Sequence, residues 1–276
     1  ARFLTSRGHQ VTILAGVPHY PLGRIHPDWR RRPFWITHEN GMKVVRVWVY
    51  AAPGRKIWRK ALNYISFFIM SVPAALFVGI KHDAIVAISP PLPSGLSAFF
   101  YSLLSRSPFV FDVQDLYPET AIQLGVLKGK RGIAFFEALE RFIYRKSAQI
   151  TVISDGFRNS VMRKGISGSK VTVMPNWADT STFSPEVTPV DKQDLGLGER
   201  FTVMFLGTIG RAQGCEIIVE AATLLRNRGD IGFCLLGDGV ARAALEMEAV
   251  KRELDNISFL DPVPHDDVPR YLVAAD

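Results

Sequence analysis

Cysteine is scarce in this sequence, and the spacings that bind zinc are absent. The 276 residues contain two cysteines, Cys215 and Cys234. Two cysteines are too few for a disulfide framework, so we expect a reducing, cytoplasmic setting and two small core side chains. The N-terminal residues show no charged segment followed by an apolar run and a small-residue cleavage site, so no signal peptide is expected here.

Several patterns that hold metals or activate nucleophiles are also missing. The sequence has no Asp-x-Asp pair, no Gly-x-Ser-x-Gly and no Gly-Lys-Ser/Thr phosphate loop. None of its six histidines lies four residues from another. The run His265–Asp267 is more typical of a helix start than of a metal site. Hydrolase and nucleotide triphosphatase functions are therefore disfavoured, and no metal or other cofactor is expected.

Charge is distributed unevenly along the chain. Residues 1–180 carry 24 Lys and Arg against 10 Asp and Glu, whereas residues 181–276 carry 9 against 16. Halves of opposite sign indicate two domains with different partners. The basic half suits nucleic acid, an anionic membrane surface or phosphorylated substrates.

Short β-branched runs alternate with helical patterns, which predicts an α/β protein with parallel sheets and crossover helices. After Asp179 the sequence becomes rich in Pro and Gly, as is typical of a connection between domains. We therefore predict a domain over 1–180, a linker over 181–199 and a second domain over 200–276. The expected strands lie near 11–15, 44–49, 84–88, 109–113, 150–153, 171–174, 202–206, 232–236 and 257–260, and the expected helices near 1–7, 60–80, 94–105, 130–147, 155–164, 214–228, 240–254 and 266–275.

Residues 61–80 form a run of twenty uncharged residues, long enough to cross a bilayer. Three alternatives remain: a membrane-spanning helix, a helix in the membrane interface and a buried crossover helix. Asn63, Pro73 and the strand expected from residue 84 count against a span. The basic cluster Arg55, Lys56, Arg59 and Lys60 favours contact of residues 55–80 with an anionic membrane surface.

Two glycine-containing loops follow strands of the second domain. In residues 205–214, FLGTIGRAQG, main-chain N–H groups and a helix dipole converge where an anion could bind, and Arg211 adds charge. A plain tight turn is the alternative. In the second loop, Gly237 and Gly239 match two glycines of the dinucleotide fingerprint, but Arg242 takes the third place. Together the loops indicate a nucleotide diphosphate at the sheet's carboxyl edge.

Polar residues follow the strand expected at 109–113. Gln114, Asp115 and Glu119 are candidate catalytic residues, because ligands of α/β folds bind at strand ends. An acidic residue capping the next helix is the alternative. Asn176 and Asp179 either line a cleft between the domains or form a turn.

In this order, the motifs resemble the family 4 retaining glycosyltransferases of GT-B architecture, in particular the bacterial branch that builds colanic acid and O-antigen, including L-fucosamine-type transferases. The resemblance runs through the whole chain. The segments that carry it are GVPHYPLGRIHPDW, SPPLPSGL, FDVQDLYPETAIQLGVL, ERFIYRKSAQITVISDGFR, KVTVMPNWAD, FLGTIGRAQG, LLGDG and YLVAAD.

This resemblance implies two Rossmann-like domains facing across a cleft. A UDP-, TDP- or GDP-linked sugar would be held mainly by the second domain, and the first would approach a lipid-linked saccharide acceptor at the inner face of the cytoplasmic membrane. No metal is implied. The donor-binding positions carried over from the family are Gly207, Thr208, Arg211, Gln213, Gly214, Gly237, Asp238, Gly239 and Val263.

The sequence also departs from the family pattern. The family's usual Arg and Lys fall on Thr208 and Gln213, and Gln114-Asp115 stands where many relatives carry His-Asp. A Gly-rich loop before residue 1 and a Glu-x7-Glu segment after the last strand are missing, so we expect a chain truncated at both ends and of low activity. The weaker alternatives are an NAD-dependent dehydrogenase and a basic membrane- or nucleic-acid-binding module. Nucleic acid is not an expected partner, since residues 29–33 are the one basic-aromatic run.

Overall fold

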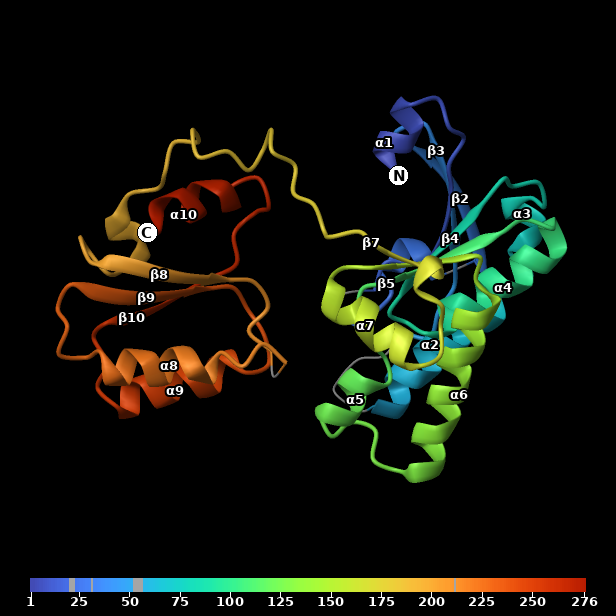
Figure 1. Ribbon diagram of the computed structural model, residues 1–276. Coiled ribbons are helices and arrows are strands. Elements are labelled where there is room, and N and C mark those ends of the chain that lie inside the picture. The colour runs from blue at the N-terminus through green and yellow to red at the C-terminus, as the bar shows by residue number, and fades with distance from the viewer. Residues whose placement is uncertain (20–22, 31, 52–56, 211) are drawn as a thin grey trace. The chain divides into compact units, whose positions relative to one another are not determined.

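The computed structural model describes residues 1–19, 23–30, 32–51, 57–210 and 212–276. The chain divides into two compact units, Ala1–Asn176 and Trp177–Asp276 (Figure 1). Each unit has its own sheets and its own hydrophobic core. The predicted α/β class with parallel sheets is confirmed.

A four-stranded parallel sheet in the order β4-β5-β6-β7 forms the centre of unit 1. Its buried side chains include Phe109, Phe111 and Ile150, which pack against Ile143 and Tyr144 of a covering helix. Because all four strands are parallel, their carboxyl ends meet at one edge. The strands are β4 (Ile85–Ser89), β5 (Phe109–Val113), β6 (Gln149–Val152) and β7 (Val171–Val173), and the helices between them are α4 (Pro93–Ser105), α5 (Glu119–Gln123), α6 (Lys130–Lys146) and α7 (Asp155–Arg163).

A second sheet of unit 1 consists of two predicted strands and one that was not predicted. β1 (Thr12–Gly16), which follows the short helix α1 (Arg2–Ser6), pairs in parallel with β3 (Met42–Val47). The unpredicted strand, β2 (Phe34–Glu39), pairs antiparallel with β3. The turn between β2 and β3 is Asn40-Gly41, with φ of 50° and 76°. An Asn-Gly pair between two β-rich runs is a strong hairpin signal, and it marks this strand in the sequence.

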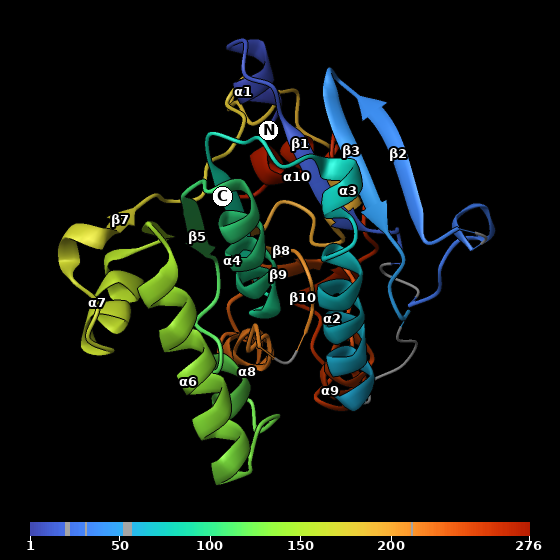
Figure 2. The ribbon, with the colours of Figure 1, turned by 90° about the vertical axis from the view of Figure 1, so that its right-hand side faces the viewer.

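The apolar segment expected as one helix over 60–80 is broken near Pro73 into α2 (Ile57–Ser71) and α3 (Ala75–Val78). The end of α2 is fastened to α4, because the Ser71 and Ser97 hydroxyls lie 2.7 Å apart and the Tyr101 hydroxyl donates to the Ser71 carbonyl over 2.8 Å. Thus α4 lies between α2 and α6 (Figure 2). Within the described ranges, no helix combines the length and apolarity needed to cross a membrane.

Unit 2 repeats the strand-helix alternation that the sequence predicts. Its parallel sheet has the order β10-β9-β8, with α8 and α9 on one face and α10 on the other (Figure 1). Cys215 and Cys234 are buried and free, as expected, and burial raises the pKa of both thiols. The elements are β8 (Phe201–Leu206), α8 (Glu216–Leu224), β9 (Ile231–Leu236), α9 (Arg242–Lys251), β10 (Ile257–Leu260) and α10 (Val268–Ala274).

The segment before β8 belongs to unit 2, and part of it packs onto the sheet of that unit. It includes a 3₁₀ helix, Lys192–Leu195, whose Leu195 side chain is fully buried. The Ser258 hydroxyl donates to the Leu195 carbonyl over 2.6 Å. This part of residues 181–199 is therefore attached to the sheet of unit 2 through β10.

Candidate functional site

The two glycine-containing loops of unit 2 lie against each other at the carboxyl edge of the sheet. The Gly207 amide donates to the Leu236 carbonyl over 3.0 Å, and the Ile209 amide donates to the Asp238 carbonyl over 2.9 Å. The Ala241 amide returns a bond of 3.0 Å to the Ile209 carbonyl. Main-chain hydrogen bonds therefore join the loops after β8 and β9 into one structure.

This contact is close enough to require glycine. A Cβ atom at position 237 would lie 1.8 Å from the Gly207 carbonyl oxygen, and one at 239 would lie 2.2 Å from the Ile209 carbonyl oxygen. Gly207 and Gly237 also have φ of 146° and 150°, which disfavours other residues. The paired glycines thus let one main chain approach the other.

Arg242, at the third position of the incomplete dinucleotide fingerprint, binds the ends of two strands. Its Nη1 group donates to the Gly237 carbonyl over 2.9 Å and to the Leu260 carbonyl over 3.3 Å. Glu246 and Asp261 lie 2.7 and 2.8 Å from the guanidinium and raise its pKa. The sequence did not predict this role of Arg242, which links the ends of β9 and β10.

The other predicted donor-binding residues belong to these two loops or, for Val263, to the loop after β10. Gly214, with φ of 62°, stands shortly before α8. The Asp238 carboxylate accepts a bond of 2.7 Å from the Gly239 amide. Val263, in the loop after β10, is half-buried, whereas Thr208, Gln213 and Asp238 are exposed and accessible to a ligand. Arg211 lies outside the described residues.

In unit 1, Gln114 is held at the end of β5. Its amide donates to the Ser89 carbonyl over 3.0 Å, and its side-chain Nε2 donates to the Asp112 carboxylate over 2.7 Å. The Thr151 hydroxyl donates to the other oxygen of Asp112 over 2.6 Å. Asp112 is buried, so these two bonds satisfy its carboxylate. Asp115, by contrast, has an exposed side chain on the loop after β5.

Glu119, at the start of α5, belongs to a partly buried ionic network. The Lys164 ammonium, at the end of α7, lies 2.7 Å from the Glu119 carboxylate and 2.6 Å from that of Glu140 on α6. Glu140 also accepts a bond of 2.8 Å from the Tyr144 hydroxyl. Burial raises the pKa of Glu140, while Lys164 opposes the shift. Lys164 therefore holds three helices together, and Glu119 is tied to it.

The two residues predicted to line a cleft differ in their surroundings. Asn176 is the exposed last residue of unit 1. The Asp179 carboxylate accepts bonds of 3.0 Å from the Ser181 amide and 2.6 Å from the Ser181 hydroxyl. These bonds lower the pKa of Asp179. Asp179 thus forms a turn, which is the second of the alternatives that the sequence left open.

The family of the chain follows from its first unit. Residues 1–177 match the family described as a glycosyl transferase 4-like domain. The chain belongs to this family. The predicted resemblance to family 4 glycosyltransferases is therefore confirmed.

This glycosyl transferase 4-like chain has relatives along nearly its whole length. It is 28% identical to the Escherichia coli colanic acid biosynthesis glycosyl transferase WcaI, covering 99% of this chain and 69% of the relative. The solved structure of Anabaena HepE with UDP-glucose has a TM-score of 0.62 at 16% identity, with 97% and 72% of the two chains covered. That of the lipopolysaccharide glycosyltransferase WaaG has a TM-score of 0.64 at 17% identity, with 100% and 67% covered. These structures confirm the GT-B fold.

Substitution of Gly237 tests the loop contact of this glycosyltransferase. We expect Gly237→Ala to destabilise unit 2 by about 1–3 kcal/mol or more, because the new methyl group meets the Gly207 carbonyl and φ becomes unfavourable. Gly229→Ala is the matched control, since a Cβ there meets no atom within 4 Å. Denaturant unfolding measures both, and equal stability of the two variants would contradict the assigned contact.

Removal of Lys164 tests the ionic network of unit 1. We expect Lys164→Met to cost about 3–5 kcal/mol at neutral pH, because a buried Glu140 carboxylate loses its cation. The pKa of Glu140, already raised, should rise further, so the loss should shrink as the pH falls and the carboxyl becomes protonated. Unfolding of this variant and of Lys146→Met, an exposed control on α6, is compared across pH. A loss that is independent of pH would refute the pairing.

Proposed function

We propose that this chain carries the donor and acceptor units of a glycosyltransferase that moves a sugar from a nucleotide sugar to a lipid-linked saccharide. The reaction would serve cell-surface polysaccharide synthesis and retain the configuration of the transferred sugar. The observation that supports the donor half most strongly is the pair of loops joined by main-chain bonds at the carboxyl edge of unit 2. In open α/β sheets, this edge is where ligands bind.

The chemistry of a diphosphate fits this edge. Phosphate oxygens accept hydrogen bonds from main-chain N–H groups at the start of a helix, and α8 begins directly after the loop at 207–214. The exposed Thr208 and Gln213 add neutral polar groups, and Arg211 is the one cation in the sequence of this loop. The HepE structure contains UDP-glucose. UDP sugars are therefore the first donors to test, with TDP and GDP sugars as alternatives.

Transfer requires that the leaving diphosphate be stabilised while the sugar is oriented. We assign stabilisation of the diphosphate to Arg211 and the loop amides, without a resident metal. Asp115 is the exposed carboxylate of the predicted catalytic set and is assigned to the acceptor hydroxyl. Gln114 supports this loop through Asp112. Glu119 supports it through Lys164.

An exposed apolar stripe on α2 supports contact with a membrane surface. Leu62, Ile65 and Ile69 are spaced by three and four residues, so they share one face of α2, with exposures of 40%, 49% and 58%. Phe67 and Met70 pack instead against the core of unit 1. In the sequence, the basic cluster of residues 55–60 overlaps the start of this helix. An apolar stripe combined with basic residues is typical of an interfacial helix, so we propose peripheral association with anionic lipid.

Titration calorimetry with UDP, TDP and GDP tests the donor site. We expect one of the three to bind in a 1:1 complex, and Arg211→Gln to weaken that binding about tenfold, because a charge-assisted phosphate contact is lost. Arg226→Gln, an exposed residue just after α8, is the control. Absence of binding, or equal affinities of the two variants, would contradict the proposed donor site.

Vesicle binding tests the membrane surface. Ile65→Glu/Ile69→Glu should lower the affinity for vesicles containing anionic lipid by at least about tenfold, because each side chain loses apolar burial and adds negative charge. Leu224→Glu/Val250→Glu changes two exposed apolar residues of unit 2 and should bind as the unmodified chain does. Co-sedimentation measures the affinities. If both double variants bind equally well, the stripe does not face the membrane.

A further inference from the structure

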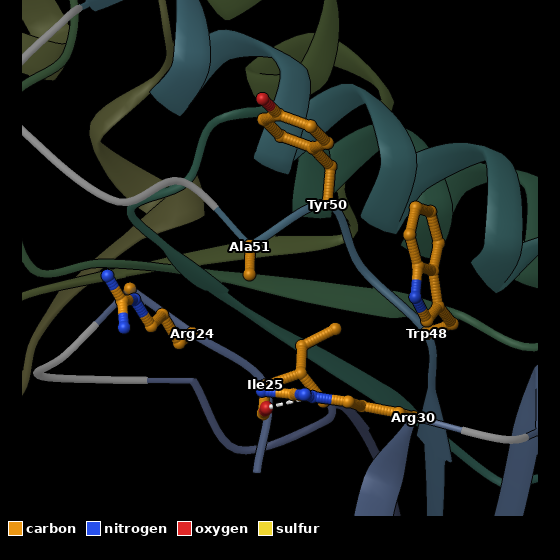
Figure 3. Close-up of a pocket in the computed structure, with 7 residues that line it drawn as sticks. Arg24, Ile25, Arg30, Trp48, Tyr50 and Ala51 are labelled. Atoms are coloured by element: carbon orange, nitrogen blue, oxygen red, sulfur yellow. Dashed lines mark hydrogen bonds between the residues drawn. The ribbon is translucent and has the colours of Figure 1, made fainter. Parts of the chain in front are cut away.

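Unit 1 contains a hollow that the donor site does not use. It has a volume of about 360 Å³ and lies where the chain leaves the carboxyl end of β3. Figure 3 shows Trp48 and Tyr50 on one side and Arg24 and Arg30 on the other. The residues that line it are Gly23, Arg24, Ile25, Arg30, Trp48, Tyr50 and Ala51.

The arginine side of the hollow is anchored to the core. The Arg30 Nε group donates to the Ile25 carbonyl over 2.9 Å, and the Ile25 side chain is buried. Between them, Pro27–Trp29 form a 3₁₀ helix. This short loop therefore has a fixed shape with Arg24 exposed at its start.

The aromatic side is anchored as well. The Trp48 amide donates to the Pro33 carbonyl over 2.9 Å. The Tyr50 amide donates to the Ser66 hydroxyl, and Asn63 Nδ2 donates to the Tyr50 carbonyl, each over 2.8 Å. Asn63 and Ser66 of α2 thus hold the main chain of Tyr50 from both directions. The main chain on this side of the hollow is thus fixed before a ligand binds, which lowers the entropic cost of binding.

The side chains of the hollow combine two kinds of recognition. Arg24 and Arg30 are exposed, and guanidinium groups match the geometry of a carboxylate or a phosphate. Trp48 is 36% exposed, and its indole ring is a flat apolar group. Binding sites of about 300–1,000 Å³ combine such apolar walls with a few polar groups. A single sugar ring that carries an anionic group satisfies both.

We propose that this hollow is a subsite for an anionic sugar, bearing a carboxylate or a phosphate, of the saccharide acceptor. Its position at the carboxyl end of β3 and the excess of basic residues in 1–180 agree with this assignment. The assignment to the acceptor rests on the proposed glycosyltransferase function. The recognition of an anionic sugar rests on the hollow alone.

Fluorine NMR of the chain labelled with 5-fluorotryptophan tests this proposal, with the Trp48 signal assigned through Trp48→Phe. The probes are methyl glucuronide, glucose 6-phosphate and the neutral methyl glucoside. We expect at least one anionic probe to shift the Trp48 signal, and the neutral probe to have no effect at the same concentration. Arg24→Gln should weaken the response about tenfold, whereas Arg131→Gln, an exposed control on α6, should leave it unchanged.

A stronger response to the glucuronide identifies a carboxylate sugar, and a stronger response to the phosphate identifies a phosphorylated one. Three results would overturn the proposal: no shift with any probe, equal shifts with the neutral sugar, or an unaltered response in Arg24→Gln. The remaining tryptophan signals show whether each variant is folded. Titration of the same sample with nucleotides reports on the donor site separately. If no nucleotide binds but the anionic sugar still shifts the Trp48 signal, the proposed function is refuted and the subsite is not.

Discussion

The close approach of two main chains in unit 2 is the constraint on which the proposed donor site depends. Gly207 and Gly237 bring the ends of β8 and β9 together, and the hydrogen bonds of Ile209 extend that contact into the loops. Side chains cannot intervene at these positions, so the two loops remain joined by their main-chain hydrogen bonds. Arg242, at the start of α9, donates to the Leu260 carbonyl at the end of β10 and so fixes the same edge. An anion that binds here meets a surface whose shape is set before binding, which is the condition for strong electrostatic recognition.

Unit 1 achieves rigidity at its own strand ends by different means. Buried side-chain bonds hold Gln114 through Asp112, and the Lys164 ammonium joins Glu119 to Glu140. Since Lys164 neutralises carboxylates from two helices, the loop between β5 and α5 is attached at both ends. Asp115 lies within that loop with its side chain exposed. Asp115 is thus the carboxylate free to meet an acceptor, whereas Gln114 and Glu119 hold its loop in place.

The parts of this structure that depend on local sequence could be predicted. Strand β5 was expected at its observed residues, and the glycine loops were found from their pattern beside strands. The antiparallel strand β2 was missed although its Asn40-Gly41 turn is a local signal. The helix break near Pro73 was also missed, since the apolar run suggested continuity. Contacts between distant residues, such as Lys164 with Glu119 or Asn63 with Tyr50, follow from the packing of helices and leave no periodic trace in the sequence.

We propose that main-chain amides at the edge of unit 2 bind the diphosphate of a nucleotide sugar. Amide chemical shifts of the ¹⁵N-labelled chain, recorded with the most tightly bound of UDP, TDP and GDP, test it most directly. We expect the largest shifts at the amides of Thr208 and Asp238, because those of Gly207 and Gly239 already donate within the protein, and only small changes in the sheet of unit 1. Shifts concentrated in unit 1, or unchanged Thr208 and Asp238 amides at saturation, would refute this binding mode.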